Sequence, residues 1–191
     1  MSESDGIAIE RTIAGDGEGF RVLVERYSQL VFRLAYRMTG SEADAEDVVQ
    51  ETFLRAYRAI STYDGRAGFP TWIYRIATNY TLDLLDKRRR RAEQPPPQRI
   101  DQEQQEWEFS TAAPGPDRLA EGSQLHRRLH LAMAQLTPQE RSAFVLRHFE
   151  ELPIEEISEA LSLGPSATRH SIFRAVQKLR RSLAPFVSSE L

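Results

Sequence analysis

Three carboxylates in the segment 41–60, SEADAEDVVQETFLRAYRAI, have a spacing that would suit metal chemistry. Asp44, Asp47 and Glu51 follow i, i+3, i+7 positions, so one face of a helix would present all three. Oxygen ligands of this kind suit Mg²⁺, but no histidine joins them from the same helix. The histidine pair at 126 and 130 is spaced i, i+4, and no nearby cysteine or carboxylate completes that site either. We therefore predict no metal and no cofactor.

The same acidic face admits two other interpretations, a solvated surface or a docking surface for a partner. Val49, Phe53, Ala56 and Ile60 would form the buried stripe of this helix. A solvated face would carry a Glu51–Arg55 pair worth ~0.2–0.5 kcal/mol, although Asp47 and Glu51 repel each other at the same spacing. Leu54, beside these acids and alongside Gln50, looks like an apolar anchor inside a polar rim. The spacing alone thus indicates a possible docking surface.

Aromatic and basic residues gather in the segment 69–91, FPTWIYRIATNYTLDLLDKRRRR. One or two cations at the end of a helix would offset its macrodipole by ~0.3–1 kcal/mol, so a run of five indicates phosphate contacts. Aromatic side chains expected to be exposed near the start of this helix are suited to stacking unpaired bases. They are Tyr63, Phe69, Trp72 and Tyr74. We therefore predict contact with melted or single-stranded DNA rather than with plain duplex.

The segment 165–191 is also basic, with five Lys or Arg residues and one acid. A lone aromatic such as Phe173 gains nothing among cations in water, but it can contact a thymine methyl group in the major groove. If this segment is the second helix of a helix-turn-helix, its base contacts come mainly from its N-terminal half. We predict base contacts from Arg169, His170, Phe173 and Arg174, phosphate contacts from Lys178 and Arg181, and phosphate contacts at the helix start near Ser166 and Thr168.

Hydrophobic periodicity predicts helices as the elements that position these side chains. No stretch alternates with period two over the length of a strand. The apolar residues of 20–38 form one broad stripe, Gly40 ends that helix, and Ser41 with Asp44 marks the next helix start. Pro70 opens a third helix that runs to about residue 91.

The C-terminal part shows the outline of a helix-turn-helix. A helix covers roughly 120–135, and Thr137, Pro138 and Glu140 give a capping box for a helix over 138–149. A short helix, a glycine-containing turn and a longer helix follow within 152–181. As a bare pattern this outline is shared by many helical hairpins.

The segment 92–118 separates two domains. It holds five of the ten prolines, with six acids and two bases, and it cannot bury enough apolar surface to offset its ordering entropy. We therefore predict an all-α protein with a helical domain over 1–91, a linker over 92–118 and a helix-turn-helix domain over 119–191.

The amino-acid composition limits the cellular compartments in which the protein is expected. There are no cysteines, which excludes a disulfide framework and fits a reducing cytoplasm. No signal peptide is visible, and no apolar run approaches the ~20 residues that span a bilayer. We predict a cytoplasmic protein with no membrane insertion of its own. No nucleotide-binding glycine motif or nucleophile–base constellation appears, so we predict that it is not an enzyme.

Three ordered motifs on both sides of the linker resemble those of bacterial sigma factors of the extracytoplasmic-function group, within the sigma-70 family. They are DAEDVVQETFLRAYRAI, FPTWIYRIATNYTLDLLDKRRRR and LTPQERSAFVLRHFEELPIEEISEAL, the last followed by a basic helix. The likeness covers roughly 18–91 and 120–183. It implies a factor that binds core RNA polymerase and directs promoter recognition, DNA melting and transcription initiation.

The resemblance also implies roles for individual residues. The first domain would bind the β′ clamp helices, using Asp44, Asp47, Gln50, Glu51, Phe53, Leu54 and Arg55. It would contact the −10 promoter element through Trp72, Arg75 and Asn79, with Lys87, Arg88, Arg89 and Arg90 at its basic end, next to Tyr63 and Phe69 of the preceding loop. The second domain would bind the β flap and the −35 element, and the linker would run through the polymerase. An anti-sigma factor is a further expected partner.

The recognition helix departs from the family pattern. Family members often carry a run like G-T-V-K-S-R-L-x-R-A-R, where this chain has SATRHSIFRAV. The base sequence recognised at −35 is therefore open. The alternative is a helix-turn-helix regulator that binds duplex DNA without polymerase, which would leave the aromatic and basic residues of the first domain without a role.

Overall fold

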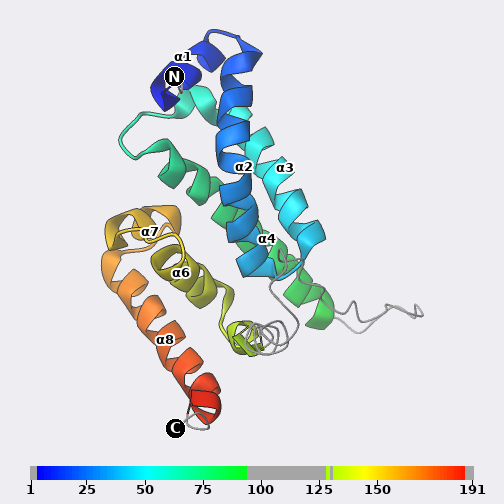
Figure 1. Ribbon diagram of the computed structural model, residues 1–191, viewed down its shortest axis with the longest axis vertical. Coiled ribbons are helices and arrows are strands. Elements are labelled where there is room, and N and C mark those ends of the chain that lie inside the picture. Colours follow the sequence, from blue (N-terminus) through cyan, green and yellow to red (C-terminus); the bar gives the residue numbers. More distant parts are fainter. Residues whose placement is uncertain (1–3, 94–127, 130, 188–191) are drawn as a thin grey trace, which may run out of the picture.

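The computed structural model describes residues 4–93, 128–129 and 131–187, and every regular element within these ranges is helical (Figure 1). The elements are α1 (Asp5–Ile13), α2 (Gly17–Thr39), α3 (Glu42–Ala59), the 3₁₀ turn η1 (Ile60–Thr62), α4 (Phe69–Glu93), α6 (Pro138–His148), α7 (Ile154–Ala160) and α8 (Pro165–Val187). The all-α prediction is confirmed. The predicted linker 92–118 lies outside the described residues beyond Glu93, as does most of the helix predicted over 120–135.

Helices α2, α3 and α4 pack against one another and build the first core. The predicted stripe of α2 is buried, with Leu23, Val31, Leu34 and Met38 all at 0% exposure. The turn between α2 and α3 has the predicted chemistry. Gly40 adopts a left-handed conformation with φ 74°, which costs glycine little, and the Ser41 hydroxyl accepts a hydrogen bond from the Asp44 N–H at 3.2 Å.

Helix α1 was not predicted from the sequence, because its buried side of Ala8, Ile9 and Thr12 is too short to show a periodic pattern. It packs closely on α2 at Gly19, where an added Cβ would lie 2.5 Å from the Ala8 carbonyl oxygen.

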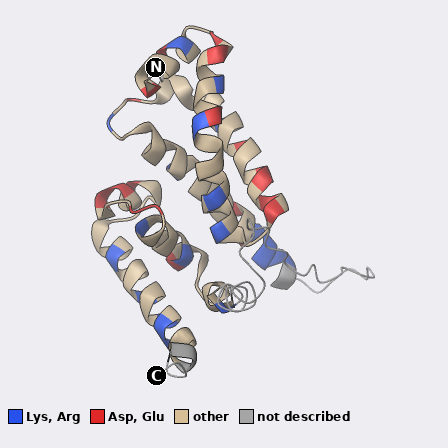
Figure 2. Ribbon diagram, viewed as in Figure 1, with Lys and Arg blue, Asp and Glu red and all other residues tan. Residues whose placement is uncertain are grey.

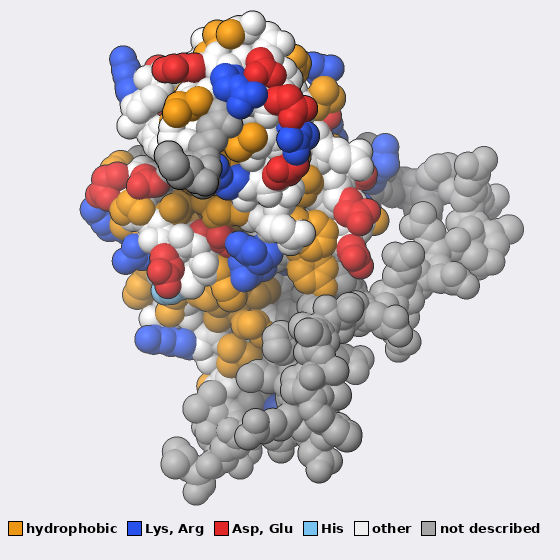
Figure 3. Space-filling view, turned by 45° about the horizontal axis from the view of Figure 1, so that its top comes forward, with side chains coloured by type: hydrophobic (Ala, Val, Ile, Leu, Met, Phe, Trp, Pro, Cys, Tyr) orange, Lys and Arg blue, Asp and Glu red, His pale blue; other side chains and the backbone are white. Residues whose placement is uncertain are grey.

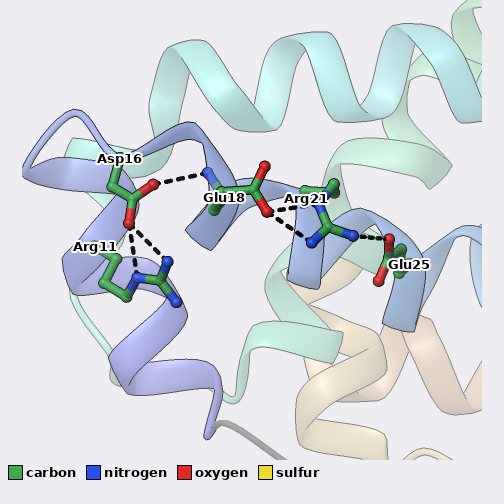
Figure 4. Close-up of polar contacts among 5 residues, drawn as sticks. All are labelled: Arg11, Asp16, Glu18, Arg21 and Glu25. Atoms are coloured by element: carbon green, nitrogen blue, oxygen red, sulfur yellow. Dashed lines mark hydrogen bonds and ion pairs between the residues drawn. The ribbon is translucent and has the colours of Figure 1, made fainter.

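A chain of ion pairs follows the turn between α1 and α2 (Figure 4). Asp16 caps α2 by accepting from the Glu18 N–H at 2.9 Å and also accepts from Arg11 at 2.7 Å, so its pKa is lowered, mainly by Arg11. Arg21 pairs with both Glu18 and Glu25 along the exposed side of α2.

The second half forms the predicted helix-turn-helix. Thr137 and Glu140 exchange the two hydrogen bonds of a capping box at the start of α6. Between α7 and α8 the Thr168 hydroxyl, fully buried, lies 2.9 Å from the Ser158 hydroxyl and donates to the Gly164 carbonyl. This contact fixes the turn that sets the angle of α8.

The two halves of the described chain pack against each other. Helices α2 and α4 of the first half contact α6 and α7 of the second half, and Figure 1 shows α7 beside the first turns of α4. Hydrophobic side chains are visible across the middle of the molecule in the space-filling view of Figure 3. Arg141 of α6 is placed in this interface, where its guanidinium donates to the Met38 carbonyl at 2.7 Å.

Candidate nucleic-acid and protein interfaces

The outer face of α3 is acidic with an exposed apolar centre. Asp47 and Gln50 are exposed, and Leu54 remains 45% exposed. The predicted Glu51–Arg55 pair is present at 2.7 Å, and the Arg55 guanidinium also lies 4.7 Å from the centre of the Tyr80 ring of α4. Figure 2 shows the acidic side of α3 at the outer edge of the molecule, above the basic end of α4.

Sequence reasoning missed Tyr57, which extends this apolar centre. The residue is 51% exposed, and its ring packs edge-on against Phe20 of α2 at a centroid distance of 5.0 Å. Tyr57 lies three positions after Leu54, so helical spacing was a signal that could have found it. The face thus combines two exposed apolar side chains with acids around them.

Asp44 does not belong to the exposed part of this face, so the expectation that one exposed face presents it together with Asp47 and Glu51 is wrong. Its side chain is only 5% exposed, and both carboxylate oxygens accept from the guanidinium of Arg88. The cause is the long α4, whose C-terminal part passes beside the start of α3. Phe53 is buried, as the apolar stripe predicted, and contacts the Phe20 ring.

The aromatic residues before and at the start of α4 form a packed cluster. Phe69 and Trp72 are 2% and 7% exposed, and the Tyr63 ring lies 5.4 Å from that of Trp72. Tyr74 is 3% exposed. The expectation of exposed aromatics is therefore wrong for these three residues. The loop 60–69 packs onto Phe69 and Trp72 through the Tyr63 ring, and the Tyr63 hydroxyl donates to the Ala67 carbonyl at 2.7 Å. Tyr74 instead faces the second half of the chain, where its hydroxyl donates to Glu150.

The basic side of α4 is open to solvent along much of its length. Asn79 is exposed, and so is each residue of the run Lys87, Arg88, Arg89 and Arg90, although the Arg88 guanidinium pairs with Asp44. Arg75 is 40% exposed at its side chain and lies 3.7 Å from Glu159 of α7. These polar residues share one helix, but the structure pairs Arg75 with the second half of the chain.

In helix α8, the predicted recognition helix, most of the residues expected to contact DNA are exposed to solvent. Phe173 is 59% exposed, and Ser166, Arg169, His170, Arg174 and Arg181 are exposed with it. Thr168 is a correction, because its buried hydroxyl is used within the turn and cannot reach a phosphate. Lys178 is 41% exposed at its side chain and pairs with Glu140 at 2.6 Å.

Several grooves border α8, and the predicted base-contacting residues line two of them. His170 and Arg174 line an open groove of about 720 Å³ whose far wall includes Leu82 and Asp86 of α4. On the other side, Arg169 and Phe173 line a shallower groove of about 350 Å³ that also includes Arg147 and Arg180. The two sides of α8 therefore border grooves of different size.

Among the described residues, the structure shows neither a clustered metal site nor a membrane-spanning helix. There, no group of three or more His, Asp or Glu side chains is arranged to hold a metal ion, and Asp44, Asp47 and Glu51 do not converge on one point. No helix in the same part of the chain has the length and apolar character needed to cross a bilayer.

Comparisons with known proteins agree with this arrangement. Residues 23–91 match Sigma-70 region 2 and residues 126–179 match Sigma-70, region 4. The chain is 36% identical over 162 residues to the ECF RNA polymerase sigma factor SigE of Mycolicibacterium smegmatis, spanning 85% of this chain and 60% of that protein. It is 32% identical to the ECF RNA polymerase sigma factor SigW of Bacillus subtilis, over 92% of this chain and 94% of that one.

A solved structure supports the fold. The sigma factor RpoE of Bartonella quintana, in complex with the anti-sigma factor NepR, superposes with a TM-score of 0.68 at 18% identity, covering 86% of this chain and 96% of that chain. Both halves of the helical architecture, together with nearly full-length sequence similarity, show that the chain belongs to the extracytoplasmic-function group of RNA polymerase sigma factors.

Proposed function

We propose that this sigma factor docks on the β′ clamp helices of core RNA polymerase through the outer face of α3. The observation that supports this most directly is Leu54, 45% exposed among acidic neighbours. An apolar anchor surrounded by polar residues is the usual anatomy of a protein interface. Asp47, Gln50, Glu51 and Arg55 supply the polar rim, whereas Phe53 and the buried Asp44 support the helix from beneath.

The first domain contacts the −10 element through α4 in this proposal. Arg75 and Asn79 offer hydrogen bonds, and Lys87, Arg88, Arg89 and Arg90 meet phosphates. Tyr63, Phe69 and Trp72 are packed together. Any stacking of bases on them therefore requires the loop 60–69 to move away from α4 when DNA binds.

The second domain contacts the −35 element through α8 and binds the β flap. The exposed Phe173 and Arg174, with Arg169 and His170, offer the apolar and hydrogen-bonding groups that recognise bases in the major groove. Ser166 and Arg181 flank them and meet phosphates, joined by Lys178 once it leaves Glu140. Thr168 acts indirectly, by fixing the turn.

The remaining features of the proposal concern partners and location. The linker 92–118 runs through the polymerase between the two contacts. An anti-sigma factor is a further partner, supported by the Bartonella quintana RpoE complex with NepR. The protein acts in the cytoplasm, where polymerase and promoters are found. Sigma factors work by binding, so we infer no catalytic activity and no cofactor for this chain.

Run-off transcription tests the proposal. The full chain is combined with core RNA polymerase on a pool of random promoter sequences, and transcripts are sequenced to recover the promoters used. We expect initiation that requires both proteins and selects paired −35 and −10 elements. Tight binding of duplex promoter by the chain alone, with no effect on transcription by core polymerase, would instead support a polymerase-independent helix-turn-helix regulator.

A further inference from the structure

Helix α1 supplies no residue to either contact proposed for the first domain, yet polar contacts hold it to α2 near both of its ends. It lies before the part of the chain that matches Sigma-70 region 2. Near its C-terminal end, Arg11 pairs with Asp16, the N-cap of α2 (Figure 4). At its N-terminal end, the Asp5 carboxylate accepts from the Arg26 guanidinium and from the Tyr27 hydroxyl. The two attachments therefore meet different parts of α2.

The Tyr27 ring packs on the aromatic cluster at the start of α4. Tyr27 is 8% exposed, and its ring centre lies 5.2 Å from that of Phe69. The Phe69 ring in turn lies 5.5 Å from the Trp72 ring and 5.9 Å from the Tyr63 ring. Figure 1 shows α1 beside η1, which it contacts and from which the loop to α4 departs. A line of rings thus connects the α1 attachment on α2 with the residues assigned to the −10 contact.

The orientation of Tyr27 is fixed by Asp5. A hydroxyl that donates to an ionised carboxylate makes a charge-assisted bond, which is stronger than a neutral one. Burial and then the bond to Asp5 raise the pKa of Tyr27 to about 12, so its hydroxyl remains a donor at neutral pH. The Asp5 charge also lies near the loop before α4, because it adds to burial in raising the pKa of Tyr63.

Stacking of an unpaired base depends on an aromatic surface that is already in place. The proposed function requires the loop 60–69, with Tyr63, to move away from α4 when DNA binds. Phe69 and Trp72 then lose one of the rings that pack on them, and Tyr27 remains as their contact from α2. A binding group held in its productive geometry by supporting residues loses less affinity to ordering when the ligand arrives.

We propose that Asp5 is a positioning residue for the −10 contact. By holding the Tyr27 hydroxyl, it keeps Phe69 and Trp72 in place for an unpaired base of the melted −10 element. This inference rests on the proposed −10 role of the first domain, and it gives α1 a part in that role although α1 itself does not contact DNA.

The test uses three variants of the full chain with core RNA polymerase. Asp5→Ala removes the carboxylate, and Tyr27→Phe removes only the hydroxyl and keeps the ring on Phe69. Arg11→Ala is the control, because it removes the other ion pair between α1 and α2. The measured quantity is the ratio of the initiation rate on a selected promoter to the rate on the same promoter with a scrambled −10 element.

We expect Asp5→Ala and Tyr27→Phe each to lower this ratio by about fivefold, because stacking on the displaced rings is weakened only where the −10 sequence is recognised. Arg11→Ala should leave it unchanged, and the matching ratio for a scrambled −35 element should stay constant in all variants. A merely structural role of α1 would lower both rates together. A −10 ratio that is the same for Asp5→Ala and the unchanged chain would overturn the inference.

A double variant tests whether Asp5 acts through Tyr27. Asp5→Ala with Tyr27→Phe should lower the −10 ratio no further than either change alone, because both break the same contact. Effects that multiply would show that Asp5 acts by a route other than Tyr27, and the proposed positioning would then be wrong.

The fluorescence of Trp72 reports on the cluster without polymerase or DNA. The chain has two tryptophans, so Trp107→Phe leaves Trp72 as the sole one. In this background, Asp5→Ala should shift the emission to longer wavelength and increase quenching by acrylamide, whereas Arg11→Ala should not. Circular dichroism checks that both variants keep their helices. No change with Asp5→Ala, or an equal change with Arg11→Ala, would contradict the positioning role.

The unchanged chain separates this inference from the proposed function. If it gives no core-dependent initiation, or initiates equally well with any −10 sequence, the proposed function fails. If it selects a −10 element and Asp5→Ala selects that element equally well, only the positioning inference fails.

Discussion

Arg88 joins two surfaces that lie 44 positions apart in the sequence, because its guanidinium closes on the buried carboxylate of Asp44. The two residues belong to different predicted contacts, one with polymerase and one with DNA. Removing Arg88 would leave a carboxylate with 5% exposure without its charged partner.

Arg88→Ala should lower the free energy of unfolding by about 1–2 kcal/mol, a value reduced from that of a fully buried pair because Arg88 is 54% exposed. Arg90→Ala, at an exposed position of the same basic run, should change it by less than about 0.5 kcal/mol. Urea unfolding followed by circular dichroism measures both. Equal effects would show that the buried pair adds nothing to stability.

We propose a role in binding rather than in stability for Asp47, because its side chain is exposed on α3. Asp47→Arg should weaken association with core polymerase by about tenfold or more, as like charge against a basic partner is unfavourable, while the melting temperature stays nearly unchanged. Asp83→Arg makes the same charge change at an exposed site of α4 and serves as the control. Surface-based measurements of binding kinetics give the affinity of each variant for core polymerase. An unaltered affinity of Asp47→Arg would contradict the docking role.

Helix α8 has an exposed side, to which the proposed function assigns base recognition, and a buried side that supports the fold. Phe173 and Arg174 are exposed, whereas Thr168, Ala175 and Leu179 are buried against α6 and α7. A helix of this kind can lose its outer side chains and keep its fold.

Phe173→Ala with Arg174→Ala should abolish transcription that depends on the −35 element, with core binding retained, because the changes remove base contacts worth ~1–3 kcal/mol each. Thr168→Val is the matched change on the buried side. It should lower stability by about 1 kcal/mol through loss of the bond near Ser158, without altering which −35 sequence is selected. Sequencing of the selected promoters distinguishes the effect of Phe173→Ala with Arg174→Ala from that of Thr168→Val. If Thr168→Val alters the −35 sequence that is selected, Thr168 does contact DNA.

The start of α6 is tied to α8 through Glu140, and this tie gives a pH dependence. Burial raises the pKa of Glu140, but hydrogen bonds from Lys178 and from the Thr137 N–H outweigh it, so the pKa lies below the usual 4.5. Because the pKa of Glu140 is lowered in the folded protein, its ionised carboxylate stabilises the fold above pH 4.5. This contribution to stability is lost as the pH falls through the folded pKa.

Glu140→Gln keeps the capping box but removes the charge that faces Lys178. It should therefore cost about 1 kcal/mol at neutral pH, and the difference from the unchanged chain should shrink below pH 4.5. Urea midpoints measured across pH test this, and a difference that is constant with pH would show that the ion pair does not contribute.

At the scale of the whole molecule, a partly buried cation lies in the contact between the halves. The guanidinium of Arg141 donates to the Met38 and Met133 carbonyls, and burial lowers its pKa. The two carbonyls lie at the ends of helices in different halves. An apolar side chain in place of Arg141 cannot donate a hydrogen bond to either of them.

Arg141→Met should therefore weaken the coupling of the two halves, so that they become protected to different extents in hydrogen exchange measured by mass spectrometry. Arg147→Met is the control, because Arg147 is exposed and donates only to Leu152 within its own half. If both variants show identical hydrogen-exchange patterns, contacts other than those of Arg141 couple the two halves.

The helices and caps of this protein were determined by its sequence. Local rules act over three or four positions, so the stripe of α2, the Ser41 cap and the Thr137–Glu140 capping box could all be predicted. Leu54, Phe173 and the exposed basic run were identified in the same way, because an apolar or charged side chain on the polar side of a helix is visible in the spacing.

The burial of Asp44, Trp72 and Thr168 was decided only by tertiary structure. Each is covered by a segment distant along the chain or by a loop that folds back: Arg88 closes on Asp44, the loop 60–69 packs on Trp72, and Ser158 meets Thr168. The contact of Glu150 with Arg37 and Tyr74 joins residues 113 and 76 positions apart. Helical periodicity says which side of a helix is polar, but not what packs against that side, and this is why the closed arrangement of the two halves could not be read from the sequence.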